Sequence, residues 1–264
     1  MLQASTVISF CFSLLLQVGY PIYVVLAYRR RTGAPWQVFA YGAVAYALFG
    51  LFTWLPLSVY LDTVLGNLYD SSIWAFSWLL AMALATSAIE CLGRYWAFGT
   101  LFSRGGYRLN GCNGVMYGLG HGVLESLLLI AGLTFVNLLA YVALHRLGSG
   151  AVLESLGAQA NPALSSALHD ILDARWHQPL VVGWERILAL PHHVAWSLLV
   201  MQSRVSRQKR WFGFAVLYQS SVAVIVPGLA RLLGFVIAEG VNLTLAALSL
   251  WIITRLYGVT VTSD

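Results

Sequence analysis

Long apolar runs, separated by short polar connections, dominate this chain. Each run is long enough to cross a bilayer of about 30 Å as a helix, which takes about 20 residues. Seven runs are predicted, at roughly 2–28, 36–60, 72–99, 113–145, 181–203, 211–228 and 234–256. The pattern predicts an all-α fold, a polytopic transmembrane helix bundle of about seven spans.

The composition supports this class, because 59% hydrophobic and 9% charged residues do not suit a soluble globular domain. We expect one integral membrane domain over residues 1–264. The connection 147–180 is expected to be an extracytoplasmic loop. Within it, the helical spacing of 163–172 after Pro162 indicates either an amphipathic helix on the outer membrane face or an ordinary structured loop.

Basic residues flank alternate membrane crossings on one side of the predicted bundle. They are Arg29, Arg30, Arg31, Arg104, Arg108, Arg204, Arg207, Lys209, Arg210 and Arg255. The positive-inside rule makes that side cytoplasmic, with the N-terminus outside and the C-terminus inside. The net charge of +5 therefore indicates contact with anionic lipid in a multi-pass protein of the cell inner (cytoplasmic) membrane, and not nucleic-acid binding.

Four polar residues lie at similar depth in four of the predicted spans: Glu90, His121, His193 and Asn242. An ionisable group in hydrocarbon costs about 2.5–3.5 kcal/mol on insertion scales. Asn242 alone would usually be a contact between helices. Four such groups on one plane predict a buried polar site.

Two pairs in this set have helical spacing. Glu90 and Arg94 are four residues apart and share a helix face, and a glutamate that precedes an arginine is the favourable order for an ion pair. Alternatively, the pair is purely structural and the Arg94 side chain extends toward the inner membrane interface. His121 and Glu125 lie one turn apart, so the carboxylate could orient the imidazole or share a metal with it. The glycines around His121 let another backbone or a substrate approach closely.

The fifth predicted span carries a polar stripe. Glu185 and Arg186 lie near its outer end, and Arg186 and His193 are seven residues apart on one face.

The order of these motifs resembles a known superfamily. Glu-x3-Arg, aromatic-x3-His and His-x3-Ser on successive spans are similar to the signature of the CAAX-protease and bacteriocin-processing superfamily of intramembrane glutamic proteases. The segments GLGHGVLES and GAPWQVFAYG, and the ER pattern before His193, resemble its YhfC-like branch. One departure is Cys91, which stands where the family usually has a second carboxylate.

The resemblance implies a role for each matched residue. Glu90 would activate the water, His121 and His193 would be the histidines of the second and third motifs, and Ser197 would hold the position of a small polar residue. His193 with Asn242 or Ser197 would stabilise the oxyanion, and His121 would hold the water or protonate the leaving amine.

In this scheme Glu125 orients His121, Arg94 balances the charge of Glu90, and no cofactor is expected. The same residue types leave a zinc site open, with Glu90, His121, Glu125 and His193 as ligands.

The expected function is hydrolysis of peptide bonds in membrane-embedded proteins or lipidated peptides. The expected partners are the lipid bilayer and, in addition, other membrane subunits. Three alternatives stay open: a catalytically degenerate member acting as a membrane-subunit, assembly or binding protein, a haem-carrying anchor, and a proton-relay transporter. The axial haem ligands would be chosen from among His121, His145, His192 or His193.

Overall fold

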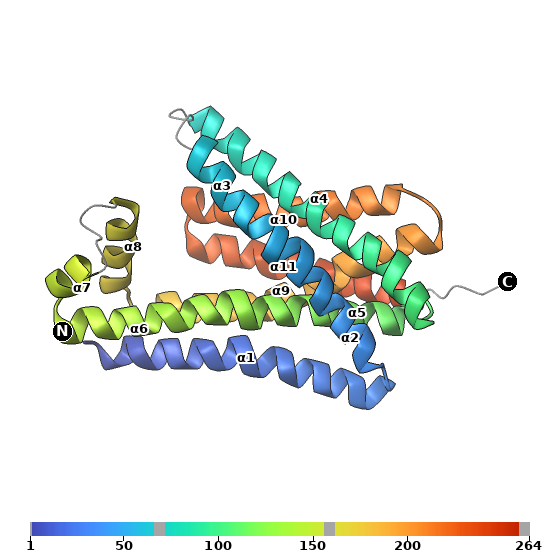
Figure 1. The fold of residues 1–264 in the computed structure, drawn as a ribbon, viewed down its shortest axis with the longest axis horizontal. Helices are drawn as coiled ribbons and strands as arrows, with labels where there is room; N and C mark the ends of the chain where they lie inside the picture. Colours follow the sequence, from blue (N-terminus) through green and yellow to red (C-terminus); the bar gives the residue numbers. More distant parts are fainter. Residues whose placement is uncertain (1, 66–71, 156–161, 259–264) are drawn as a thin grey trace. The chain divides into compact units, whose positions relative to one another are not determined.

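The structure, a computed structural model, describes residues 2–65, 72–155 and 162–258, and these residues form helices without any β-strand. The elements, drawn in Figure 1, are α1 (Ala4–Thr32), α2 (Trp36–Ala45), the π-helical η1 (Tyr46–Trp54), α3 (Leu55–Leu65), α4 (Ser72–Gly105), α5 (Gly111–Leu124), the π-helical η3 (Glu125–Ala131), α6 (Gly132–Leu147), α7 (Ser149–Ser155), α8 (Pro162–Leu172), α9 (His177–Val205), α10 (Arg210–Leu233) and α11 (Phe235–Tyr257). The predicted all-α class is confirmed.

Six helical stretches of the described chain are long and apolar enough to cross a membrane: Ala4–Thr32, Trp36–Leu65, Ile73–Gly105, Gly111–Leu147, Arg210–Leu233 and Phe235–Tyr257. The seventh predicted run, 181–203, lies inside α9. That helix has 29 residues and is long enough, but its ionisable and amide side chains make it too polar to meet the same criterion. The multi-pass membrane character is therefore confirmed with six such stretches, where the sequence predicted seven.

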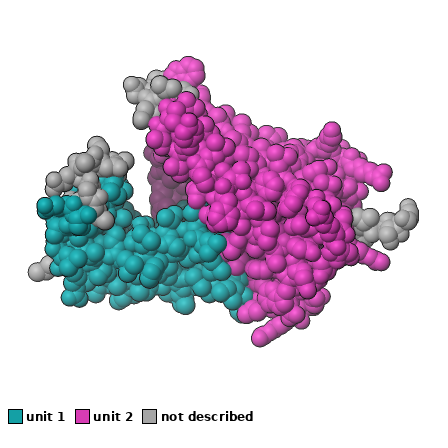
Figure 2. All heavy atoms as spheres, viewed as in Figure 1, with its two compact units in different colours: residues 1–23, 125–187 teal, residues 24–124, 188–264 magenta. Residues whose placement is uncertain are grey.

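The chain divides into two compact units, shown in different colours in Figure 2. Unit 1 comprises Met1–Tyr23 and Glu125–Ile187, and unit 2 comprises Val24–Leu124 and Leu188–Asp264. Three helical stretches run through both units: α1, the continuous α5–η3 helix, and α9.

Each of these stretches has an irregularity within four residues of the unit boundary in the sequence, and in α5–η3 it is the change to a π-helix at Glu125. Pro21 lies in α1 and Pro191 in α9, and each removes a helical hydrogen bond to the carbonyl four residues earlier. In unit 1 the carbonyl freed by Pro21, that of Gln17, accepts a hydrogen bond from the Ser126 hydroxyl at 2.7 Å. This side chain satisfies a backbone group that hydrocarbon could not solvate.

In unit 1, α6 packs against α7 and α8. Leu144, Val152 and Leu168, one from each helix, form a small buried cluster. Residues 163–172, for which the sequence indicated either an amphipathic helix or a structured loop, lie in α8, and the apolar face of this helix is covered by protein. Residues 156–161 of the predicted 147–180 connection lie outside the described residues.

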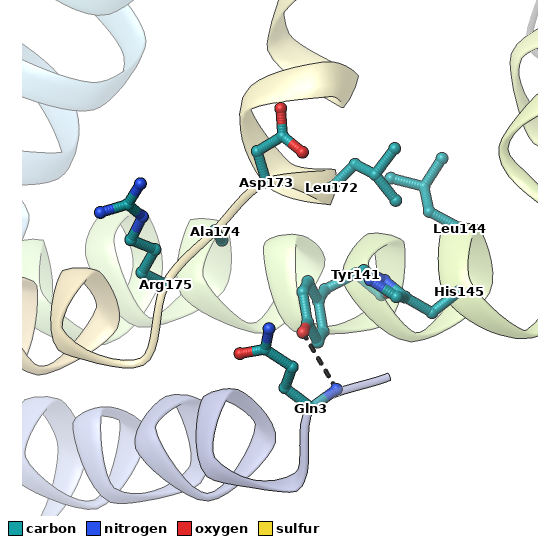
Figure 3. Close-up of a pocket in the computed structure, with 8 residues that line it drawn as sticks. All are labelled: Gln3, Tyr141, Leu144, His145, Leu172, Asp173, Ala174 and Arg175. Atoms are coloured by element: carbon teal, nitrogen blue, oxygen red, sulfur yellow. Dashed lines mark hydrogen bonds between the residues drawn. The ribbon is translucent and has the colours of Figure 1, made fainter. Parts of the chain in front are cut away.

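Unit 1 also has a polar pocket of about 660 Å³. Figure 3 shows Gln3, Tyr141 and His145 on one side of it and Asp173 and Arg175 on the other. The backbone N–H of Gln3 donates to the Tyr141 hydroxyl at 3.3 Å, and His145 Nδ1 lies 2.9 Å from the Tyr141 carbonyl oxygen. His145, a candidate haem ligand by sequence, therefore belongs to unit 1.

In unit 2, α2 crosses α5 with the two backbones in contact. A β-carbon on Gly42 would collide with the Tyr117 carbonyl oxygen, and one on Gly120 would collide with the Phe39 carbonyl oxygen. On another face of α5, Gly118 lies against the backbone of Val194 in α9. The prediction that glycines around His121 admit a neighbouring backbone is confirmed.

Candidate functional site

Five polar side chains from four helices of unit 2 meet in one buried cluster. Glu90 and Arg94 come from α4, His121 from α5, His193 from α9 and Gln219 from α10. All five are more than nine-tenths buried, and Arg94 and His121 are 0% and 1% exposed. We call these five residues the polar cluster.

Arg94 lies at the centre of the polar cluster. Its Nη2 is 3.2 Å from Glu90 Oε2, 3.0 Å from His121 Nε2 and 3.5 Å from His193 Nδ1. The predicted Glu90–Arg94 ion pair is confirmed. The alternative of an arginine extending to the membrane interface is wrong, because the guanidinium is fully buried among these partners.

Gln219 is a member of the cluster that the sequence reasoning missed. Its Nε2 donates to Glu90 Oε2 at 2.8 Å, and its Oε1 accepts from Arg94 Nη1 at 3.2 Å. Both contacts fix the amide orientation, because only the nitrogen can donate and only the oxygen can accept. The polar run Tyr218–Ser221 inside an apolar span was the available signal.

Cys91, the departure from the family pattern, also points at Gln219. Its Sγ lies 3.6 Å from Gln219 Oε1 and is fully buried. The thiol is a weak donor and here takes up a lone pair of that amide oxygen. A carboxylate at this position would present a second acceptor to the same oxygen.

The two contacts of His121 Nε2 constrain its proton. Arginine has only donors, so Arg94 Nη2 at 3.0 Å needs a lone pair on Nε2. That same Nε2 lies 3.3 Å from Glu90 Oε2, where a hydrogen bond would need a proton on it. A neutral ring cannot satisfy both, and the shorter contact favours the tautomer with its proton on Nδ1.

Several polar atoms in or near the cluster have no hydrogen-bond partner among the described residues. They are Arg94 Nε, Tyr117 Oη, His121 Nδ1 and Trp196 Nε1. Tyr117 lies one turn before His121, and the Trp196 ring lies 5.1 Å from that of His193. Buried donors normally find an acceptor, so such groups indicate positions for water or for oxygen atoms of a substrate.

A second buried network lies beside the polar cluster in unit 2. His192 Nδ1 is 2.8 Å from Ser249 Oγ, which is also 2.8 Å from the Tyr218 hydroxyl. His192 Nε2 is 3.4 Å from Asn242 Oδ1, and Asn242 Nδ2 is 3.4 Å from Glu239 Oε2. Asn242, expected with His193, therefore has these contacts in the second network.

Other sequence candidates have partners of their own. The Ser197 hydroxyl donates to the backbone carbonyl of His193 at 2.8 Å. Arg186 Nη1 donates to Glu125 Oε1 at 3.0 Å within unit 1. Glu185 also lies in unit 1, half-buried in α9. Arg186, expected on one helix face with His193, thus has Glu125 as an ion-pair partner within unit 1.

Glu90, His121 and His193 offer three ligand atoms that lie within 4.8 Å of one another. One carboxylate and two imidazoles are an ordinary donor set for zinc, so these residues fit a metal by their chemistry. The structure groups these three, whereas the sequence expectation also included Glu125. Arg94 Nη2 approaches the same three side chains, so a metal would compete with the guanidinium for their lone pairs.

Comparisons with known proteins identify the family of this chain. The sequence model of a family described as YhfC intramembrane metalloprotease matches residues 12–245, which include the whole polar cluster. A Bacillus subtilis (strain 168) protein described as "Uncharacterized membrane protein YhfC" is 26% identical over 201 residues, covering 75% of this chain and 74% of its own. No solved structure gives a significant match. Neither match favours a haem anchor or a transporter, and the chain belongs to the YhfC family of intramembrane metalloprotease-like membrane proteins.

Proposed function

We propose that this chain is an intramembrane endopeptidase of the inner membrane, in which Glu90 activates the attacking water. The observation that carries the proposal is the buried cluster in which Arg94 contacts Glu90, His121 and His193, and Glu90 also contacts His121. An isolated structural ion pair would need only Glu90 and Arg94. With Gln219 from α10, four helices contribute to this polar cluster, and its residue types suit acid–base chemistry.

The first step assigns Glu90 as the general base. Its carboxylate takes a proton from water, and the resulting hydroxide attacks the carbonyl carbon of the scissile peptide bond. Arg94 balances the charge of Glu90, and Gln219 Nε2 holds the Oε2 atom at 2.8 Å. Both contacts restrict the carboxylate to one position before water arrives.

The second step requires donors for the tetrahedral oxyanion. His193 belongs to the cluster, and Tyr117 and Trp196 have buried donors without a partner among the described residues. These two side chains are better candidates than Ser197 and Asn242, whose donors already have acceptors. The C–N bond then breaks as the leaving amine receives a proton through His121, restoring the ionised Glu90.

The substrates would be membrane-embedded or membrane-proximal peptides, including lipidated ones. Glu90 lies 14 residues before Arg104 on α4, about 21 Å along a helix with a rise of 1.5 Å per residue. A helical substrate at that depth must unwind, since its carbonyls are otherwise hydrogen-bonded. The burial of all five cluster residues also requires helices of unit 2 to part before a peptide can enter.

A zinc-dependent peptidase is the second candidate, favoured by the compact Glu90, His121 and His193 donor set and by the description of the family. Zinc held by these residues would act as a Lewis acid toward the scissile carbonyl and the water. In that case Arg94 must leave its present position between the donors. Glu90, His121 and His193 would then act as ligands.

The test uses the full-length protein in proteoliposomes with a library of quenched transmembrane peptides. Glu90→Gln should lower cleavage by about 10²-fold or more, because the base is lost while side-chain volume is kept. Glu239→Gln is the matched control, since Glu239 is a buried carboxylate in α11 outside the polar cluster. Equal cleavage by wild type and Glu90→Gln would remove Glu90 from the mechanism. No cleavage by any variant would favour a member that binds without cleaving.

A further inference from the structure

Unit 2 has a second feature, apart from the polar cluster, that the proposed function does not use. A pocket of about 490 Å³ lies where the end of α9 turns into α10 against α4. Its lining residues are Leu92, Tyr95, Ser203, Arg204, Arg207, Lys209 and Phe212. We call it the basic pocket.

The charges in the basic pocket all have one sign. Arg204, Arg207 and Lys209 contribute three cations, and no carboxylate lines the pocket. The sequence has no Asp or Glu within 91–124 or 186–238, the segments that supply these walls and their neighbours. By contrast, the unit 1 pocket in Figure 3 contains Asp173 and Arg175 together. The basic pocket therefore favours an anion.

Arg204 is held in place by α4. Its Nε and Nη2 donate to the Tyr95 carbonyl oxygen at 3.2 and 2.8 Å, and its guanidinium lies 3.6 Å from the centre of the Tyr95 ring. These contacts fix a cation at the pocket wall and use none of its charge in an ion pair. A preorganised guanidinium suits the oxygen atoms of a phosphate group.

Arg207 has an unusual backbone for its residue type. With φ at 55°, it is the one non-glycine residue of the described chain in the left-handed region. Glycine adopts this conformation far more readily at the end of a helix. An arginine at this position indicates a use for its side chain, because the backbone alone would favour glycine.

The remaining walls are apolar and reach the surface. Leu92 and Tyr95 are 52% and 37% exposed, and with Phe212 they lie on α4 and α10, two helices that meet the criterion for a membrane span. In a bilayer, lipid acyl chains would contact these apolar side chains directly beside the cations of the pocket. Cations beside apolar walls complement an anionic phospholipid, which carries a phosphate next to its acyl chains.

We propose that the basic pocket binds one anionic glycerophospholipid, with its phosphate among Arg204, Arg207 and Lys209 and an acyl chain along Leu92 and Phe212. The predicted cytoplasmic side of the bundle carries the same charge pattern, so the site faces the leaflet rich in anionic lipid. The inference is independent of peptidase activity.

The experiment measures lipid binding to the full-length protein by native mass spectrometry from mild detergent. The probes are phosphatidylglycerol, phosphatidylcholine of the same chain length and inorganic phosphate. We expect phosphatidylglycerol to bind more tightly than phosphatidylcholine by on the order of tenfold, and inorganic phosphate not to displace it at millimolar concentration. Equal binding of the two lipids, or displacement by inorganic phosphate or by an acidic peptide, would overturn the proposal.

The key variant is Arg207→Gly, which removes the cation while suiting the left-handed backbone. The protein should keep its melting temperature and lose phosphatidylglycerol affinity by about fivefold, and by more when combined with Lys209→Gln. Arg104→Ala with Arg108→Ala is the matched control, since both are exposed cations outside the pocket lining. A comparable loss of phosphatidylglycerol affinity in the control would show that binding depends on general surface charge, and it would refute the proposed site.

Discussion

Arg94 Nη2 lies 3.0 Å from His121 Nε2, between two helices, with the whole guanidinium removed from solvent. This contact joins the Glu-x3-Arg motif of α4 to the histidine motif of α5. It makes Arg94 a central group of the site and not an external counter-ion. The charge of Glu90 and the proton position of His121 both depend on this one side chain.

Replacing Arg94 should damage both stability and activity. Arg94→Ala leaves Glu90 buried without its ion-pair partner, so we expect the free energy of unfolding to fall by about 3–5 kcal/mol. Arg94→Lys keeps the charge but cannot contact Gln219, Glu90 and His121 together, so cleavage should fall at least about tenfold with smaller loss of stability. Thermal unfolding in detergent and peptide cleavage measure the two effects. A loss of less than about 1 kcal/mol in Arg94→Ala would contradict the central role.

The affinity of the protein for zinc should depend on the Arg94 side chain. Because Nη2 approaches all three donors, we expect purified wild type to keep its cleavage rate in chelator. We expect Arg94→Ala to take up zinc more tightly than wild type, since the donors Glu90, His121 and His193 are then free of the guanidinium. Elemental analysis and isothermal titration measure this difference. Stoichiometric zinc in wild type, with activity lost on chelation, would establish the second candidate function.

Gln219 should act as a positioning residue. Gln219→Leu removes two buried hydrogen bonds to charged groups, those with Glu90 and Arg94, and we expect it to cost about 1–3 kcal/mol of stability. Cleavage should show a lower kcat with little change in KM, because the proposed role of Gln219 is to position Glu90 and Arg94. Ser221→Ala, two residues later on α10, is the matched control. An unchanged kcat in Gln219→Leu would limit the residue to a structural role.

The crossing of α2 and α5 should not tolerate a methyl group. Gly120→Ala places its β-carbon against the Phe39 carbonyl oxygen, so we expect a loss of about 1–3 kcal/mol from overpacking. Gly240→Ala in α11 has no neighbouring atom within 4 Å of the added carbon and should be neutral or stabilising by up to about 1 kcal/mol. Melting temperatures of the two variants give the comparison. Similar values would argue that the close crossing is absent in the membrane.

The sequence predicted the spans well where a helix is apolar throughout, and less well for α9. Leu190, Val194, Leu198 and Met201 of α9 are buried, yet Glu185, Arg186 and the two adjacent histidines lower its average hydropathy. A window average cannot distinguish a helix buried in protein from one exposed to water. The packing of Val194, in the part of α9 that belongs to unit 2, against Gly118 of α5 depends on contacts that no local average contains.

The candidate site was predictable in part. Helical spacing gave the Glu90–Arg94 pair, and the similar depth of Glu90, His121 and His193 gave their convergence. Depth does not fix rotation about the helix axis, so Asn242 was placed with His193 although its contacts are with His192 and Glu239. Gln219 was missed for the related reason that an amide in a span usually serves only as a contact between helices.

By itself, the sequence determined the chemical class of this protein: an all-helical, multi-pass membrane chain with a carboxylate, an arginine and two histidines at one depth. These features follow from hydropathy and from the 3.6-residue helical period, which are local properties. Only the tertiary structure decided that Arg94 lies among the donors of Glu90, His121 and His193, and that Gln219 joins them. The reason is physical, because the facing of one helix toward another depends on side-chain packing between segments far apart in the chain.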